Sequence, residues 1–224
     1  YSVCVLEQNP QIGGCLQTFR RGGNTFDTGF HYIGGLGEGE SLNRLFNYFG
    51  LMGLPWQKLD EECFDEVILE GKSYKFASGH ERFVETLAQE FPHQKSNLKQ
   101  YSDFLRNVGD NLFHSFQTKD PSQLYDSPLF TRSAYDFLKE TIDDPTLRNV
   151  LSGTALKMEL NAEKLPLYIF AQINDSFIRS AWRIKGGGSQ IIDSLAESIK
   201  KMGGSILTKA KSTRLIETDG KISA

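Results

Sequence analysis

Near the start of the chain, Ser2 leads into the apolar run Val3-Cys4-Val5-Leu6, and the acid Glu7 follows it directly. A short, continuous apolar run of this kind is typical of a strand that is buried in a parallel sheet. Asn9-Pro10 and Gly13-Gly14 then force the chain into a loop. The first residues therefore predict a buried strand that ends in a carboxylate and leads into a glycine-containing turn.

An acid at the end of a strand has a known use in the dinucleotide-binding βαβ unit. There the second strand ends in a carboxylate that hydrogen-bonds a ribose, ~20 residues after a Gly-x-Gly-x-x-Gly turn. Because almost nothing precedes Val3, we expect the first strand, this turn and its helix to lie upstream of Tyr1. A hairpin that begins near Arg214 is cut short at Ala224. The sequence thus predicts a fragment that lacks both termini of a longer protein.

The composition is that of an ordinary globular protein. Its 224 residues are 39% hydrophobic, and 25 Lys and Arg against 28 Asp and Glu give a formal net charge of −3. This excludes a disordered or coiled-coil chain, and it argues against nucleic-acid binding because no overall positive field attracts phosphates. No run of about 18 apolar residues occurs, so we expect no membrane-spanning helix.

Cysteines and histidines show no pattern of a metal site or of a disulfide framework. Cys4, Cys15 and Cys63 are sparse and form no Cys-x-x-Cys pair, which favours a reducing, intracellular compartment. No targeting segment is observable in these residues. The histidines have no metal-ligand spacing, and we expect three of them to be surface or hydrogen-bonded helix residues, namely His80, His93 and His114. We predict no metal site.

Hydrophobic periodicity divides the chain into α/β ends and a mixed, Phe-rich middle. Short strand-like pieces stand at residues 25–26 and 31–33, and a helix is expected from Ser41 to Gly50. A second helix begins after Gly186-Gly187-Gly188, and a strand at Ile206-Leu207 follows it. The apolar face of that helix comprises Ile191, Ile192, Leu195, Ile199 and Met202.

The middle of the chain is expected to hold a hairpin and several helices. The hairpin covers Phe64–Phe76, with its turn at Glu70-Gly71. The helices are expected near residues 80–90, 94–117, 131–140 and 145–152. This pattern predicts a nucleotide-type α/β domain, residues 1–50 and 183–224, interrupted by a substrate domain of residues 51–182.

A second glycine-rich stretch, Gly34–Glu40, resembles a phosphate-binding loop only superficially. The Gly-x-Gly-x-x-Gly frame that starts at Gly35 has Glu40 where glycine is required. Glu38 and Glu40 would also repel a pyrophosphate. We interpret this stretch as a flexible turn.

Three motifs occur in order near the N-terminus: Val5-Leu6-Glu7-Gln8, Gly13–Phe19 and Phe26–Gly34. Together with the stretch from Gly186 to Gly204, they resemble the phytoene desaturase and retinol saturase group of FAD-dependent oxidoreductases. The resemblance is sharp over residues 1–35 and 183–215 and diffuse between them. Cys15 stands where the desaturases usually have Arg, which favours the saturase side.

The resemblance implies an FAD/NAD(P)-binding, Rossmann-like domain of the glutathione-reductase type, interrupted by an α+β substrate domain. It implies that Glu7 binds the ribose of FAD and that Gly13 and Gly14 let the backbone approach the phosphates. The other residues that it places along the cofactor are Gln17, Thr18, Asp27, Gly29, Gly187, Gly188, Ser189 and Ser212, the last through a backbone contact to adenine.

The candidate proton donor to the substrate is His31 or Tyr32, since neutral His and Tyr both donate protons. Taken alone, these positions have ordinary structural alternatives. Gly13-Gly14 also fits a plain turn, Asp27 a turn cap and His31 a core histidine.

The implied function is FAD-dependent reduction or desaturation of carbon–carbon bonds in a long apolar polyene, with NAD(P)H as a candidate electron donor. Such a substrate dissolves in membranes, so we expect an apolar small-molecule substrate and peripheral membrane contact, the latter in the Phe-rich middle. Two alternatives share the fold, a flavin amine oxidase and a polyene isomerase. A third, of another class, is non-enzymatic binding of prenylated proteins, as in Rab escort and GDP-dissociation-inhibitor proteins.

Overall fold

The structure is a computed structural model that describes residues 2–111, 128–159, 161, 163–218 and 221–222. The chain divides into two compact units. The first unit comprises Tyr1–Tyr32, Leu45–Gln57 and Ile184–Ala224, and the second comprises Ile33–Arg44 and Lys58–Arg183. Each unit is therefore built from segments that lie far apart in the sequence.

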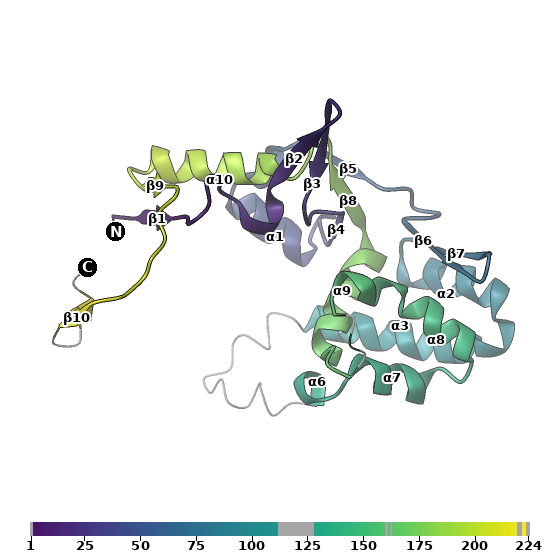
Figure 1. The fold of residues 1–224 in the computed structure, drawn as a ribbon. Helices are drawn as coiled ribbons and strands as arrows, with labels where there is room; N and C mark the ends of the chain where they lie inside the picture. Colours follow the sequence, from purple (N-terminus) through teal and green to yellow (C-terminus); the bar gives the residue numbers. More distant parts are fainter. Residues whose placement is uncertain (1, 112–127, 160, 162, 219–220, 223–224) are drawn as a thin grey trace. The chain divides into compact units, whose positions relative to one another are not determined.

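A parallel strand pair joins the two ends of the chain in the first unit (Figure 1). β1 (Cys4–Leu6) pairs with β9 (Ser205–Leu207), with Val5 opposite Ile206. The pairing continues past the strands, because the N–H of Glu7 donates to the carbonyl of Leu207 over 2.8 Å. Both predicted strands are present, but the burial predicted for the first is wrong in this chain, because all three residues of β1 are exposed.

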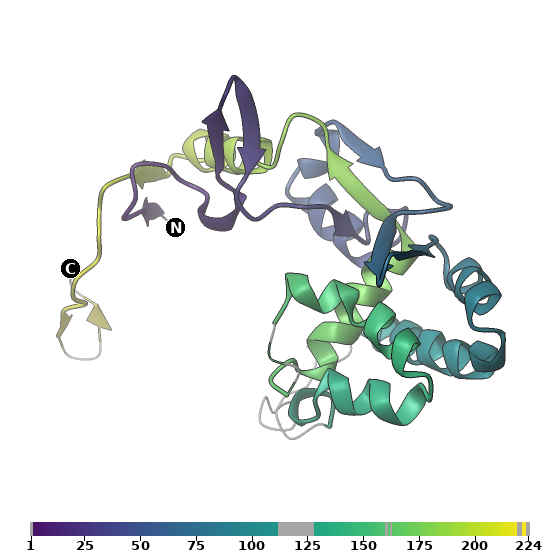
Figure 2. The same cartoon turned by 45° about the vertical axis from the view of Figure 1, so that its right-hand side comes forward.

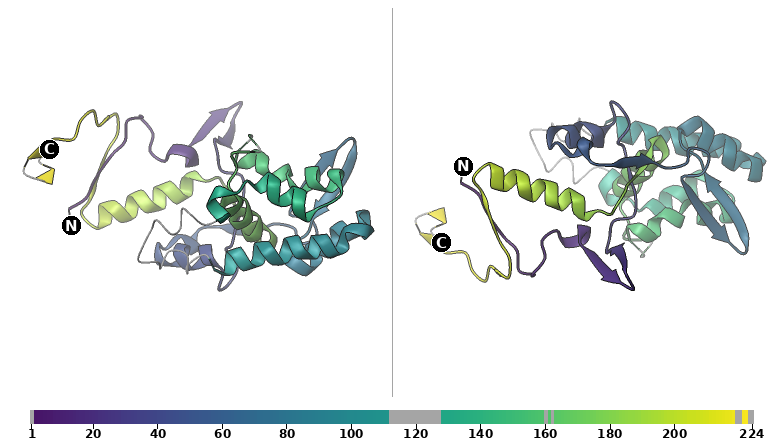
Figure 3. Two further views of the ribbon diagram at one scale, coloured as in Figure 1. Left: turned by 90° about the horizontal axis from the view of Figure 1, so that it is seen from below. Right: turned by 90° about the horizontal axis from the view of Figure 1, so that it is seen from above.

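The helix α10 (Ser189–Lys201) leads into β9 and is straight in the views of Figure 3. The helix prediction is confirmed, and Ile191 is buried as expected. Met202 was assigned to the apolar face, which is wrong, because it follows the last helical residue and its side chain is 78% exposed. Gly203, with a φ of +83°, turns the chain away from the helix at this point.

Between β1 and the second unit the chain forms a turn and a hairpin. The single 3₁₀ turn η1 (Gly14–Leu16) precedes β2 (Thr18–Arg21), which pairs antiparallel with β3 (Asn24–Asp27). The sequence indicated only residues 25–26 of this hairpin. The polar tip Arg20–Asn24 interrupts the apolar alternation that marks a strand.

A small aromatic cluster completes the first unit. Trp56 begins β5 (Trp56–Lys58), and its ring lies 6.4 Å from that of Phe30 and 5.5 Å from that of Phe46, centroid to centroid. Its indole N–H donates to the carbonyl of Leu51 over 2.9 Å. Phe46 belongs to α1 (Ser41–Tyr48), which begins at Ser41 as predicted and is followed by η2 (Leu51–Gly53).

The second unit packs helices around a buried aromatic core. Its hairpin, β6 (Asp65–Leu69) with β7 (Lys72–Phe76), is confirmed, and Glu70 and Gly71 both take positive φ in its tight turn. Phe83, Tyr101 and Phe170 are each at most 1% exposed. The helical elements are α2 (His80–Glu90), η3 (Pro92–Gln94), α3 (Lys95–Asp110), α6 (Pro128–Thr131), α7 (Ala134–Thr141), α8 (Pro145–Leu151), η4 (Gly153–Lys157) and α9 (Leu167–Arg179).

Two of the predicted helices differ from those observed. The helix expected at 94–117 is seen as η3 and α3 up to Asp110, and residues 112–117 with His114 lie outside the described residues. The helix expected at 131–140 is divided, because the Ser133 hydroxyl caps α7 by accepting a hydrogen bond from the N–H of Asp136.

In the described part of the chain, no helix is long and apolar enough to cross a membrane.

The stretch Gly34–Glu40 contains a turn, as the sequence had indicated, but its contacts hold it in place and do not leave it loose. β4 (Ile33–Gly34) pairs antiparallel with β8 (Ala181–Ile184), and Leu36 is 1% exposed. The Glu40 carboxylate accepts the N–H of Gly37 over 2.8 Å and the Ser180 hydroxyl over 2.5 Å. Distant partners on and after α9 thus fix a segment that is glycine-rich in sequence.

Candidate functional site

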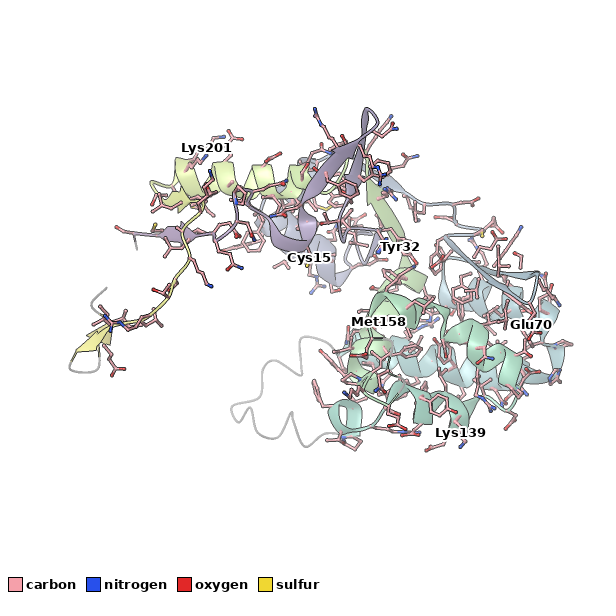
Figure 4. The ribbon with its side chains drawn as sticks, viewed as in Figure 1. Cys15, Tyr32, Glu70, Lys139, Met158 and Lys201 are labelled. Atoms are coloured by element: carbon pink, nitrogen blue, oxygen red, sulfur yellow. The ribbon has the colours of Figure 1, made fainter. Side chains whose placement is uncertain are left out.

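All the residues that the sequence assigned to a cofactor or to proton transfer lie in the first unit. They come from five places: the end of β1, the turn η1, the β2–β3 hairpin with the residues after it, the N-terminal end of α10, and the segment after β9. Side chains around η1 and the hairpin are drawn in Figure 4, where Cys15 marks the turn η1.

Glu7 follows the last residue of β1, at the carboxyl end of the parallel pair. One carboxylate oxygen, Oε1, accepts the backbone N–H of Asn9 over 2.7 Å, and the side chain is half-buried. The backbone carbonyl of Glu7 accepts the N–H of Ala210 over 2.8 Å. Among the described residues Oε2 has no hydrogen-bond partner. Ligands of open α/β sheets bind at this edge, so the position fits a residue that accepts ribose hydroxyls.

Gly13 and Gly14 have different surroundings. Gly13 has a φ of +112°, and a Cβ there would lie 2.8 Å from Cγ1 of Ile192 on α10. Gly14 has a φ of +53°, and a Cβ there would meet nothing within 4 Å. Gly13 therefore lets the turn pack against α10, while Gly14 presents open backbone. The open backbone at Gly14 is compatible with the predicted approach of a cofactor phosphate.

Gln17 and Thr18 follow the turn η1, and the hydrogen bonds of Gln17 hold the local backbone. The Gln17 amide donates to the carbonyl of Gln11 over 2.6 Å. The Thr28 hydroxyl donates to the carbonyl of Gln17 over 2.9 Å and to that of Cys15 over 3.2 Å. Gly29 lies close to the same turn, because a Cβ there would be 3.0 Å from the Cys15 carbonyl. Thr28 was missed in the sequence, where it offered no pattern beyond its neighbours Asp27 and Gly29.

Asp27 joins the hairpin to the glycine turn before α10. Its Oδ1 accepts the backbone N–H of Gly188 over 2.7 Å, and a Cβ at Gly187 would lie 3.3 Å from the same oxygen and 3.7 Å from Cγ2 of Thr18. An acidic side chain at the N-terminus of a helix is favoured by the helix dipole. The structure thus brings Thr18, Asp27, Gly187 and Gly188 together. Asp27 caps a turn, the structural alternative that the sequence left open, although this turn lies 161 positions along the chain.

The turn before α10 depends on glycine. Gly186 and Gly187 have φ values of +96° and +98°, and a Cβ at Gly188 would lie 3.0 Å from the ring of Phe30. Gln190 holds the turn with its amide, which donates to the carbonyls of Lys185 and Gly187. Ser189 is the first residue of α10 and is half-buried.

The remaining predicted residues are His31, Tyr32 and Ser212. His31 is exposed and Tyr32, labelled in Figure 4, is half-buried; both follow the hairpin in the chain. Ser212 is exposed, two residues beyond Ala210, which is bound to the end of β1. The Cys15 thiol is exposed. Whether any of them touches a cofactor stays a prediction.

A buried Ser-His-Asp row in the second unit has another character. The His80 ring lies 2.8 Å from the Ser102 hydroxyl through Nδ1 and 2.9 Å from Asp175 Oδ1 through Nε2, and all three are buried. Ser102 lies within α3, where the backbone N–H groups bond within the helix and cannot form an oxyanion hole. The row links α2, α3 and α9, which agrees with the expectation of a hydrogen-bonded helix histidine.

The residues present fit a flavin dinucleotide in two respects. Glu7 keeps one carboxylate oxygen available at the edge of the parallel pair, and Gly14, later in the same loop, leaves its backbone open. The described residues contain no group of three or more His, Cys, Asp or Glu that could hold a metal ion.

The chain is similar to several known proteins. It is 29% identical to all-trans-retinol 13,14-reductase of Danio rerio over 98% of this chain and 39% of that protein. It is 23% identical to prolycopene isomerase 1, chloroplastic, of an Oncidium hybrid cultivar, over 98% of this chain and 40% of that protein. The chain therefore spans about two fifths of the length of these curated relatives. These similarities confirm the resemblance to the phytoene desaturase and retinol saturase group.

The fold is shared with a solved structure. The crystal structure of the PF1083 protein from Pyrococcus furiosus matches with a TM-score of 0.55 and 19% identity, over 93% of this chain and 45% of that one. A family model described as "flavin containing amine oxidoreductase" matches residues 1–224. The helices and strands described above agree with a flavin-binding α/β fold. The chain belongs to the flavin containing amine oxidoreductase family.

Proposed function

We propose that the chain is part of an FAD-dependent oxidoreductase that reduces or desaturates carbon–carbon bonds of a long apolar polyene. The observation that carries this proposal is the position of Glu7, at the carboxyl end of a parallel strand pair with Oε2 unpartnered among the described residues. The family supports a flavin, and the relatives named for retinol reduction and prolycopene isomerisation support a polyene as substrate.

We assign cofactor binding and substrate binding to two different domains. Residues 1–50 and 183–224 would hold FAD, and residues 51–182 would bind the substrate. An apolar cavity of about 200 Å³ in the second unit supports the second assignment. It lies between α7, η4 and α9, and its lining includes Leu138, Leu156, Leu165 and Phe170. A polyene chain requires such a lining, since each buried CH₂ group contributes about 0.8 kcal/mol.

The protein's own groups would position the cofactor and transfer a proton. When bound, FAD supplies the hydride chemistry at the double bond. Glu7 would accept ribose hydroxyls, and the open backbone at Gly14 would face the phosphates. His31 or Tyr32 would donate the proton to the alkene carbon next to the one that receives the hydride. Both residues follow the hairpin that Asp27 anchors. NAD(P)H is the proposed electron donor.

The test uses the natural full-length protein that contains this chain, purified with FAD. We expect the absorbance of a bound flavin. After anaerobic reduction of that flavin, all-trans-retinol should give a product that is two hydrogens heavier by mass spectrometry. The absence of any bound flavin would reject the proposal and favour a non-enzymatic, prenyl-protein-binding role.

Two other outcomes would redirect the proposal. A polyene product of unchanged mass, formed without net oxidation of the flavin, would show an isomerase, as the name of the Oncidium relative indicates for that protein. Hydrogen peroxide released with amines, and no reaction with polyenes, would show an amine oxidase.

A further inference from the structure

Two phenylalanine side chains lie together on one face of the β2–β3 hairpin. Phe19 and Phe26 are directly opposite each other in the ladder, and their rings stack at 5.3 Å between centroids with an interplanar angle of 19°. They are 49% and 45% exposed. Two large apolar rings held side by side at the surface form a patch that ordinarily marks an interaction site.

The alternation of side chains along the strands shows that this face points away from α10. Thr18 and Asp27 form the neighbouring pair on the opposite face, and both approach Gly187 at the N-terminal end of α10. Because successive side chains in a strand point to opposite faces, the Phe19–Phe26 pair is directed outward. The hairpin projects beyond α10 in Figures 1 and 2.

The tip of the hairpin is positively charged. Residues 19–26 contain Arg20 and Arg21 and no acid, in a chain whose formal net charge is −3. Both arginines are exposed, and neither has an ion-pair partner within the described residues. Arg21 shares a face with Phe19, two residues away, and Arg20 lies on the other face. Exposed aromatic rings with adjacent unpaired arginines complement an anionic lipid surface.

We propose that the tip of the β2–β3 hairpin, residues 19–26, docks on an anionic lipid bilayer, with the two Phe rings in the interface and the arginines at the phosphates. The proposal rests on the proposed function in one respect, because a polyene dissolved in a membrane gives the enzyme a reason to bind there. It moves the expected membrane contact from the Phe-rich middle to the first unit. Glu7 and Gly14 are not part of this surface.

The test is flotation of the full-length protein with vesicles of phosphatidylcholine mixed with phosphatidylserine. We expect the protein to float with these vesicles and to bind pure phosphatidylcholine vesicles at least about tenfold more weakly. The reason is that each basic residue near an anionic surface adds to the binding free energy. The double variant Phe19→Ser/Phe26→Ser should lose at least about tenfold in vesicle affinity, because burial of each ring is favourable. Arg20→Gln/Arg21→Gln should lose the dependence on phosphatidylserine and on salt.

A second exposed aromatic pair provides a matched control. Tyr48 and Phe49 contact edge to face at 5.0 Å and are 83% and 46% exposed, but residues 45–57 contain no Lys or Arg. Tyr48→Ser should leave flotation unchanged. If it lowers flotation as much as the Phe19→Ser/Phe26→Ser change, any exposed aromatic side chain supports nonspecific hydrophobic binding to the vesicles, and the proposal fails.

Flotation and flavin content are measured separately, so the two proposals can fail independently. Vesicle binding with no bound flavin leaves the hairpin proposal standing and rejects the proposed function. A flavin-containing protein that does not float overturns the hairpin proposal. So does a Phe19→Ser/Phe26→Ser variant that floats as well as the unchanged protein.

Discussion

The carboxylate of Asp27 accepts the backbone N–H of Gly188 over 2.7 Å, and this bond joins residues that are 161 positions apart in the chain. Asp27 ends β3, and Gly188 precedes α10, so the bond holds the hairpin against the helix N-terminus. Its acceptor is a carboxylate, which makes such a bond about twice as strong as a neutral one. Asp27, which the resemblance places along the cofactor, is therefore also the residue that anchors the hairpin.

Asp27→Ala is expected to destabilise the protein by about 1–2 kcal/mol, because the Gly188 N–H loses a charged acceptor. Asp27→Asn keeps an oxygen acceptor and should lose about half as much. Urea unfolding measures both, and limited proteolysis should cut the hairpin of the Ala variant first. Equal stability of Asp27→Ala and the unchanged protein would show that the bond is not formed.

Gly13 and Gly14 should respond differently to alanine. Gly13→Ala places a methyl group 2.8 Å from Ile192 at a φ of +112°, and it should lower the free energy of unfolding by about 2 kcal/mol or more. Gly14→Ala meets open space at a φ of +53° and should cost only about 1 kcal/mol. If the backbone at Gly14 faces the cofactor, this milder change should weaken FAD binding by at least about tenfold. Titration of the apoprotein with FAD separates the two effects, and unchanged FAD affinity in Gly14→Ala would count against the assignment.

Glu7→Gln tests the ribose contact without disturbing the local turn. The glutamine carbonyl can still accept the Asn9 N–H that now bonds Oε1, but the negative charge is lost. We expect FAD to bind about 10–100-fold more weakly, because hydrogen bonds to charged groups contribute about 1.5–3 kcal/mol. The Tm of the apoprotein should not change. An FAD affinity equal to that of the unchanged protein would remove Glu7 from the site.

His31→Ala and Tyr32→Phe distinguish the two candidates for proton donation. Each should leave the flavin absorbance intact, since neither side chain is assigned to cofactor binding. The variant that lacks the donor should lose about 100-fold or more in turnover, the usual contribution of general acid catalysis. Single-turnover oxidation of the reduced flavin by the polyene measures this loss. Full turnover in both variants would place the donor elsewhere.

The stability of α8 should depend on pH through Asp144, its N-cap. Partial burial raises the pKa of Asp144, but the N–H groups of Leu147 and Thr146 and the His93 ring outweigh this, so the pKa lies below its ordinary value of 3.8. A carboxyl whose pKa is lowered by folding stabilises the protein above its unfolded pKa and loses this effect as the pH falls through the folded pKa. Asp144→Ala should cost about 1 kcal/mol at neutral pH, a difference that shrinks below pH 3.8.

Asp144→Asn is the matched control for this prediction, because asparagine also caps helices and does not titrate. Urea unfolding at neutral and acidic pH should show a pH-dependent difference from the unchanged protein for the Ala variant. A difference that persists unchanged at acidic pH would mean that the charge of Asp144 contributes nothing. His93 is 63% exposed, so His93→Gln should change stability little.

The sequence by itself determined the features that follow from local patterns. The apolar run before Glu7 predicts β1, the 3.6-residue period after Gly188 predicts α10, and Glu70-Gly71 predicts the turn of the β6–β7 hairpin. In each case a few adjacent residues limit the backbone to one conformation. The order of the glycine and acid motifs was also sufficient to indicate the family.

Only the tertiary structure decided which distant residues meet. Asp27 binds the turn before α10, and Glu40 binds Ser180 and so fixes a loop that appeared flexible from its glycines. Phe19 and Phe26 share an exposed face because the polar tip between them closes a hairpin that periodicity does not reveal. The residues in these contacts lie as many as 161 positions apart in the chain. A local pattern of apolar residues does not indicate which distant residues meet when the chain closes such a long loop.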